Sequence, residues 1–172
     1  SWKNVLSWYI GDLGSWTTSK VNDMQYMFYC AGESAGEFDT GNLNNWDTSQ
    51  VGDMYIMFYN AGMKASSFNI GQLDAWDVSK VEDMTFMFMG AGAETTDWNI
   101  GNLANWNVGN VKDMGGMFSS AGENSKSFDI GSLATWNTSN VTDIGQMFMK
   151  AGYNADEITL DLSGWNTLNV SK

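Results

Sequence analysis

Apolar positions recur along this chain with a fixed spacing of 30 residues. With few exceptions, each unit contains in order Gly-x-Leu, a tryptophan, a valine, the string DMxxMF and an Ala-Gly pair. The tryptophans that mark the units are Trp16, Trp46, Trp76, Trp106, Trp136 and, after a spacing of 29, Trp165. A repeat of this length predicts a stack of supersecondary units, because one unit cannot bury its apolar face alone.

The first half of each unit, here called the Trp segment, has the spacing of a short strand. In residues 43–51, LNNWDTSQV, polar residues separate Leu43, Trp46, Thr48 and Val51. This spacing is close to the L-x-x-L-x-L-x-x-N pattern of a leucine-rich-repeat strand. We therefore expect one strand per unit, with its tryptophan in the core. The Trp segments are residues 13–21, 43–51, 73–81, 103–111, 133–141 and 162–170.

The second half, here called the Met-Phe segment, changes its period. In residues 53–62, DMYIMFYNAG, Met54, Met57 and Phe58 stand at i, i+3 and i+4, which is one face of a short helix. An aspartate precedes this pattern and Ala-Gly follows it, as expected for a helix N-cap and a C-terminal stop. The segment predicts a helix of about two turns. The Met-Phe segments are residues 23–32, 53–62, 83–92, 113–122 and 143–152.

The aspartates that begin these segments form a column without exception. A row of carboxylates could bind calcium or serve acid/base chemistry. The favoured interpretation is structural, because each aspartate stands where a helix cap is needed, and Lys112 beside one of them would discourage a cation. The expected helix caps are Asp23, Asp53, Asp83, Asp113 and Asp143.

These elements predict an α/β fold, a leucine-rich-repeat-like solenoid of six short parallel strands and five short helices. Stacked strands lie about 4.8 Å apart and helices about 10 Å apart, so the strands should line the concave side and the helices the convex side. Nothing in the composition divides the chain, so residues 1–172 are expected to form a single domain. Its units are 1–9 (partial), 10–39, 40–69, 70–99, 100–129, 130–159 and 160–172 (partial).

Short polar residues beside the tryptophans form a strip on the presumed concave face. Such a strip could hydrogen-bond a ligand such as a sugar or a peptide, although short polar side chains are also usual on solvated strands. Plain solvation is the favoured interpretation, and a ligand strip is the alternative. The candidate ligand strip consists of Asp47, Ser49, Asp77, Ser79, Asn107, Asn137 and Ser139.

Charge and composition remove several classes of function. The chain carries 20 acidic residues against 8 basic ones, a formal charge of −12, which repels phosphate backbones and anionic lipid. It has no histidine and no Gly-rich phosphate loop, and its single cysteine, Cys30, stands in a variable column. We therefore expect no nucleic-acid partner, no membrane insertion, no cofactor, no metal and no enzyme activity.

The strings NWDTSQVGDMYIMF, NWNVGNVKDMGGMF and TWNTSNVTDIGQMF resemble a bacterial surface-protein repeat of unknown function. That repeat is abundant in mycoplasma lipoproteins and occurs with BspA-like surface proteins. The resemblance implies a leucine-rich-repeat-like solenoid at a cell surface, with a role in adhesion or host interaction. It implies no catalytic residues.

The expected function is a non-enzymatic extracellular surface module for adhesion, recognition or structural assembly. Its partner would be a protein or glycan at a surface, or copies of itself stacked head to tail. A filament subunit and an ice- or glycan-binding solenoid are the alternatives, and a glycoside hydrolase is the least favoured one. The chain begins and ends in partial units, which favours a longer array or head-to-tail stacking.

Overall fold

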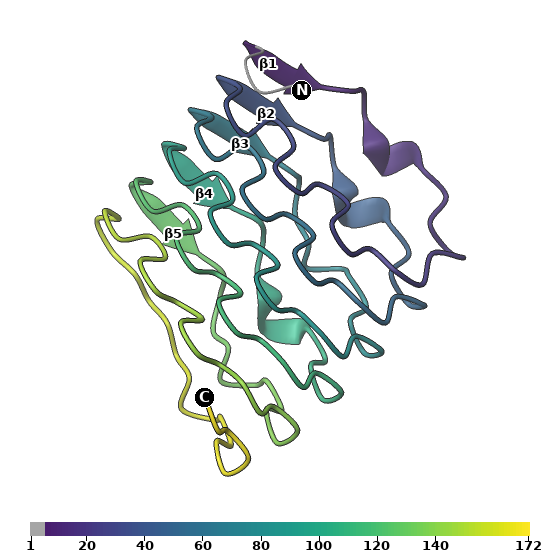
Figure 1. Ribbon diagram of the computed structural model, residues 1–172, viewed down its shortest axis with the longest axis vertical. Helices are drawn as coiled ribbons and strands as arrows, with labels where there is room; N and C mark the ends of the chain where they lie inside the picture. The colour runs from purple at the N-terminus through teal and green to yellow at the C-terminus, as the bar shows by residue number, and fades with distance from the viewer. Residues whose placement is uncertain (1–5) are drawn as a thin grey trace.

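The computed structural model describes residues 6–172, so residues 1–5 of the partial unit 1–9 lie outside the described residues. The chain winds as a row of stacked coils, with one repeat unit in each turn (Figure 1). We number the coils by their units: coil 1 is residues 10–39, coil 2 is 40–69, coil 3 is 70–99, coil 4 is 100–129 and coil 5 is 130–159.

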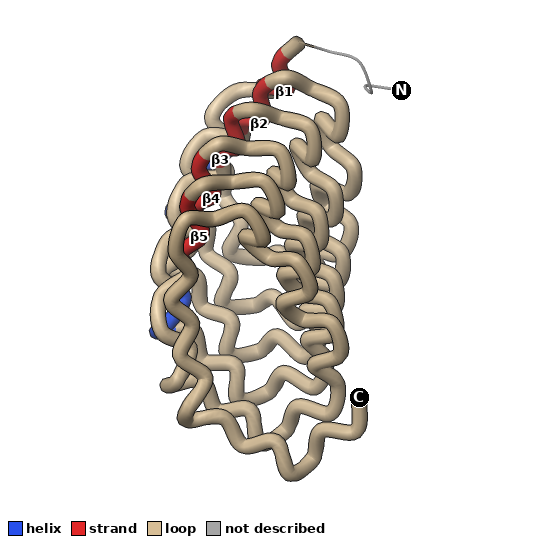
Figure 2. Tube along the Cα trace, turned by 90° about the vertical axis from the view of Figure 1, so that its left-hand side faces the viewer, coloured by secondary structure: helices blue, strands red, loops and turns tan. Residues whose placement is uncertain are grey.

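Within residues 6–172, five short strands run side by side along one edge of the stack (Figure 2). They are β1 (Ser7–Tyr9), β2 (Glu37–Asp39), β3 (Ser67–Asn69), β4 (Asp97–Asn99) and β5 (Ser127–Asp129). β1, β2 and β3 form one parallel sheet and β4 and β5 another, and each pairing joins residues one repeat apart. The central residue of each of β2 to β5 is a buried aromatic, so these strands turn one ring inward.

The Trp segments, which were predicted to be the strands, instead turn corners. Three of them contain a single turn of 3₁₀-helix: η1 (Leu13–Ser15), η2 (Leu43–Asn45) and η3 (Leu103–Asn105). Each 3₁₀ turn is capped by an aspartate or asparagine side chain that accepts the N–H two residues later. The short polar residues thus bend the backbone, because such side chains compete with ladder hydrogen bonds.

The Met-Phe segments contain no α-helix anywhere in residues 6–172. In coil 2 the N–H of Met57 donates to Met54, three residues back, at 3.2 Å, whereas a helix would use the residue four back. Alternate N–H groups leave the coil and donate to carbonyls of coil 3, as Phe58 does to Met87 at 2.8 Å. Intra-coil turns and inter-coil bonds therefore alternate along the segment.

The predicted α/β, leucine-rich-repeat-like solenoid with five convex helices is consequently wrong. A helix needs about 10 Å of width, but these coils also pair backbone to backbone on the Met-Phe side, where strand spacing is about 4.8 Å. Bridges at Asp23–Asp53, Asp53–Asp83, Asp83–Asp113 and Asp113–Asp143 show this close pairing. The i, i+3, i+4 pattern places Met54, Met57 and Phe58 in the core through successive turns instead.

This turn-rich path requires a left-handed backbone at regular positions. In each Met-Phe segment, three positions have φ between 51° and 66°. One of them is the glycine of the Ala-Gly pair, and the other two are occupied mostly by residues other than glycine. Such residues cost about 1–2 kcal/mol each in this conformation, which the surrounding ladder must offset. They are Tyr26, Cys30, Ile56, Asn60, Phe86, Ser120, Gln146 and Lys150.

The interior is a set of parallel side-chain columns. Tryptophan rings stack on one another at 6.1–6.4 Å with planes within 11°, and the phenylalanines of the Met-Phe segments stack at 5.0–5.6 Å. Within this tryptophan column, each indole N–H from Trp46 onward donates to a leucine carbonyl of the preceding coil, as Trp76 does to Leu43 at 2.9 Å. The prediction of core tryptophans is confirmed for Trp46, Trp76, Trp106 and Trp136, whereas Trp16 is half exposed.

Candidate functional site

The predicted polar strip lies on the surface, with its members one repeat apart. Asp47, Asp77, Asn107 and Asn137 are exposed, and the serines two residues later are partly exposed. The strip follows the corner after each tryptophan, so it faces outward from the Trp segments. The structure brings together all seven predicted residues as two adjacent columns.

Hydrogen bonds within the strip explain its residue types. The carboxylate of Asp47 accepts from both the N–H and the hydroxyl of Ser49, at 3.1 and 2.6 Å. Asn137 accepts from Ser139 in the same way, at 3.2 and 2.7 Å. These are Asx turns, which need a short side-chain acceptor. The Ser49 hydroxyl and N–H hold the pKa of Asp47 below its ordinary value, and Ser79 does the same for the pKa of Asp77.

A second polar column runs beside the strip and ties the coils together. The side-chain amides of Asn110, Asn140 and Asn169 each donate to a backbone carbonyl of the preceding coil at 2.6 Å. Lys80 reaches back to the Gln50 side chain at 2.8 Å. Sequence reasoning missed this column, although Asn recurs in it one residue after the strip.

The aspartate column performs the same local task as the strip. Each aspartate accepts the N–H two residues later, at 2.7–2.9 Å, and no helix follows, so the predicted role of helix cap is wrong. The five residues are Asp23, Asp53, Asp83, Asp113 and Asp143. Burial raises the pKa of Asp53, and the negative charges of Asp83 and Asp23 in the neighbouring coils raise it further. Within residues 6–172 no group of three or more potential ligand side chains is arranged to hold a metal ion.

An exposed tyrosine cluster lies on the outer side of the Met-Phe segments of coils 1 and 2. It consists of Tyr26, Tyr29, Tyr55 and Tyr59, and the first two are 50% and 51% exposed. Tyr26 meets Tyr55 edge to face with centroids 5.4 Å apart, and Tyr29 stacks on Tyr59 at 5.4 Å. The sequence analysis did not predict this cluster, because Tyr26 and Tyr55 stand at positions that vary from repeat to repeat.

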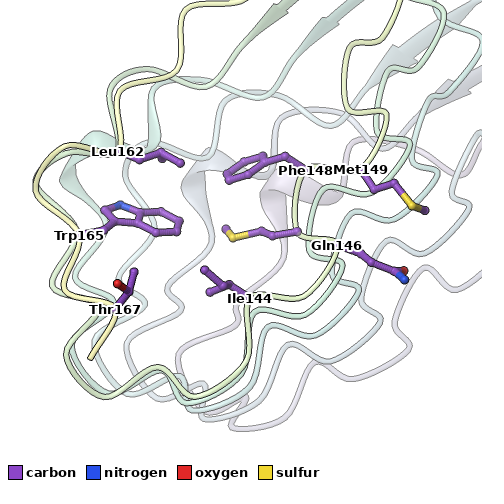
Figure 3. A pocket seen from close by; sticks show the side chains of 8 residues that line it. Ile144, Gln146, Phe148, Met149, Leu162, Trp165 and Thr167 are labelled. Atoms are coloured by element: carbon purple, nitrogen blue, oxygen red, sulfur yellow. The ribbon is translucent and has the colours of Figure 1, made fainter. Parts of the chain in front are cut away.

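Coil 5 borders an apolar groove of about 590 Å³ between its Met-Phe segment and the last Trp segment. Figure 3 shows Ile144, Phe148, Leu162 and Trp165 directed into this groove. The same positions are occupied by buried core residues in coils 2 to 4. The groove is thus a continuation of the interior columns, and its lining offers stacking surfaces and few polar groups.

Comparison with known proteins places the repeat in a family. A family model described as "Mycoplasma protein of unknown function, DUF285" matches residues 4–98 and, in a second overlapping match, residues 61–172. No curated protein and no solved structure matches the chain. In the described part of the chain, no helix has the length and apolar character needed to cross a membrane.

Proposed function

Because the chain belongs to the DUF285 family of Mycoplasma proteins of unknown function, we propose a function from the geometry: a non-enzymatic recognition module that binds a surface protein or glycan through its outer faces. The observation that carries this proposal is the polar strip, in which exposed Asp and Asn side chains, with partly exposed Ser side chains beside them, recur at the same position of four successive coils. A module of this kind would act where partners are displayed, at a cell surface or outside the cell.

The packing of the molecule supports an outer binding face. The interior of coils 2 to 4 is filled by buried tryptophan, phenylalanine, leucine and methionine columns, so along these coils a partner would meet the surface columns. Each Asx turn uses one oxygen of its carboxylate or amide, which leaves the second carboxylate oxygen or the amide nitrogen for a partner. Repeated groups along one line suit an extended partner, because many weak contacts then add up.

A binding screen tests this function directly. The protein is applied to an array of glycans and to surface-protein ligands, together with Asp77→Asn, Ser79→Ala and the pair Asn107→Ala and Asn137→Ala. Asp77→Asn preserves the Asx acceptor, as Asn107 shows in the next coil, so it changes charge without changing the corner. Selective binding that the strip variants weaken would support the proposal. Binding that is unchanged in every strip variant would remove the strip from it.

A further inference from the structure

The outer side of the Met-Phe segments is uneven along the stack. Coils 1 and 2 present the four rings of the tyrosine cluster, and coil 3 presents Phe86 and Met89. Coil 4 has Gly115 and Gly116 at the corresponding inner positions, and a Cβ at Gly116 would come within 2.4 Å of the Phe86 ring. Phe86 thus covers the glycine, and the continuous aromatic surface ends there.

The four tyrosines form one connected surface. Tyr26 and Tyr29 lie edge to face at 6.0 Å, and each contacts a tyrosine of coil 2, so every ring touches another. In coil 5, Figure 3 shows Gln146 and Met149, which occupy the columns of Tyr26 and Tyr29, pointing away from the core groove. In coil 1 the same columns hold the half-exposed rings of Tyr26 and Tyr29, whereas Ile56, in the Tyr26 column of coil 2, is buried. The rings of Tyr26 and Tyr29 therefore have no packing task in a core.

Negative charge lies next to these rings. Asp23, Asp53 and Asp83 precede the aromatic positions by two or three residues and are bridged coil to coil. Burial raises the pKa of Tyr55, and the nearby Tyr26 and Asp83 raise it further. The neighbouring Cys30 raises the pKa of Tyr29, with smaller contributions from Tyr59 and Glu33. The phenols of Tyr29 and Tyr55 thus stay neutral near pH 7. Residues 21–63 contain no lysine or arginine.

We propose that the tyrosine cluster and the aspartates beside it form a docking surface for a polypeptide segment that carries exposed arginine side chains. A guanidinium binds the face of an aromatic ring by cation–π attraction and stacks on it with its planar group. Carboxylates at the edge add long-range attraction and orient the cation. An anionic partner would meet repulsion from the same groups, so charge complementarity selects the basic segment.

The probe for this surface is an unstructured peptide in which arginines alternate with Gly-Ser spacers, measured by fluorescence anisotropy against the whole chain. A matched peptide has citrulline in place of arginine, which keeps the shape and removes the charge. We expect citrulline to weaken binding by roughly five- to thirtyfold, as loss of two exposed cation–π contacts implies. Equal affinity for the two peptides, or no measurable binding of either, would overturn the proposal.

Variants then separate the rings from general negative charge. Tyr26→Leu with Tyr29→Leu keeps apolar area and removes the aromatic quadrupole, so binding should fall at least about tenfold. Tyr26→Phe with Tyr29→Phe keeps the rings and should bind as the parent does. The control is Gln146→Leu with Met149→Leu, in the same columns of coil 5, which should change nothing. If the control pair weakens binding of the arginine peptide as much as the Tyr→Leu pair does, the binding is non-specific and the assignment to the tyrosine cluster is wrong.

The charge component has its own variants. Asp23→Asn with Asp53→Asn keeps both Asx turns, since asparagine fills that role at Asn69 and Asn99, and should weaken the arginine peptide most at low salt. This inference rests on the proposed recognition function but uses a different face. Loss of glycan binding in the Tyr→Leu pair would reassign the cluster to sugar. If the strip variants weaken glycan binding but the arginine peptide does not bind, only the docking surface is refuted and the proposed recognition function stands.

Discussion

Neighbouring coils are joined in different ways at their Trp segments, here called the Trp side, and at their Met-Phe segments, here called the Met-Phe side. On the Trp side, side chains supplement a single backbone bond at the leucine of the segment, such as that from Leu43 N–H to Ile70. The indole N–H groups bind carbonyls at 2.8–2.9 Å and asparagine amides add further links. On the Met-Phe side the backbone itself joins them, through alternate N–H groups and left-handed residues. The first side depends on which residues are present, and the second on which backbone angles they permit.

The largest expected effect is on the Trp side. Trp76→Ala should lower the free energy of unfolding by about 3–5 kcal/mol, because it empties a layer between Trp46 and Trp106 and leaves the Leu43 carbonyl without its indole donor. Trp76→Phe keeps an apolar ring and should cost less. Urea denaturation followed by circular dichroism measures both, and free tolerance of the alanine variant would contradict the account of this side.

Replacing one glycine on each side by alanine compares how strictly the two sides require a particular backbone conformation. Gly92, on the Met-Phe side, has φ of 53° and an added Cβ would lie 2.7 Å from the Phe68 ring, so Gly92→Ala should cost at least about 2 kcal/mol. Gly109, on the Trp side, would bring its Cβ only to side-chain atoms at 3.2 Å or more. Gly109→Ala should be close to neutral. Equal melting temperatures for the two variants would refute the contrast.

The aspartate column permits a smaller test. Asp83→Ala removes the acceptor for the Thr85 N–H, bonded at 2.7 Å, and should cost about 1 kcal/mol. Asp83→Asn keeps an acceptor and should cost less than half of that. Adding calcium should leave the melting temperature of the parent protein unchanged, and a large rise would indicate a metal site instead.

The smallest effect concerns pH and has opposite signs on the two sides. The pKa of Asp77 is lowered by Ser79, so its contribution to stability is present above the unfolded pKa and is lost as pH falls. The pKa of Asp53 is raised, chiefly by burial, so ionisation weakens the fold as pH rises from the unfolded pKa through the raised one. Carboxyl titration by NMR should place Asp77 below Asp53. The reverse order would contradict both assignments.

Sequence alone located the buried columns, because burial follows the period of the apolar residues whatever the backbone does between them. Leu43, Val51, Met54 and Phe58 are all buried in coil 2 as the repeat suggested. The secondary structure could not be read in the same way. Spacing of i, i+3 and i+4 fits a helix and also fits consecutive turns, and only the pitch between neighbouring coils excludes the helix.

The sequence predicted the position of the polar strip but not the reason for its residue types. Asp47 and Asn137 are exposed and in register, but their residue types are explained by the turns they close, which a strand assignment had hidden. The tyrosine cluster gave no repeat signal, since its columns change from Tyr26 to Ile56 to Phe86 and then to Gly116. Departure from the repeat was the signal, because half-exposed Tyr26 stands in a column where coil 2 has the buried Ile56.

The tryptophan column is also an optical array. Its rings lie 6.1–6.4 Å apart and nearly parallel, so the transition dipoles of neighbouring indoles couple strongly and an absorbed photon can pass from ring to ring. Transfer between parallel dipoles preserves polarisation, so emission from the folded chain should stay polarised and be weighted toward Trp16, the most exposed indole of the column. Opening of a single coil breaks the column, which lets the protein's own ultraviolet spectrum report separation of one turn from the next.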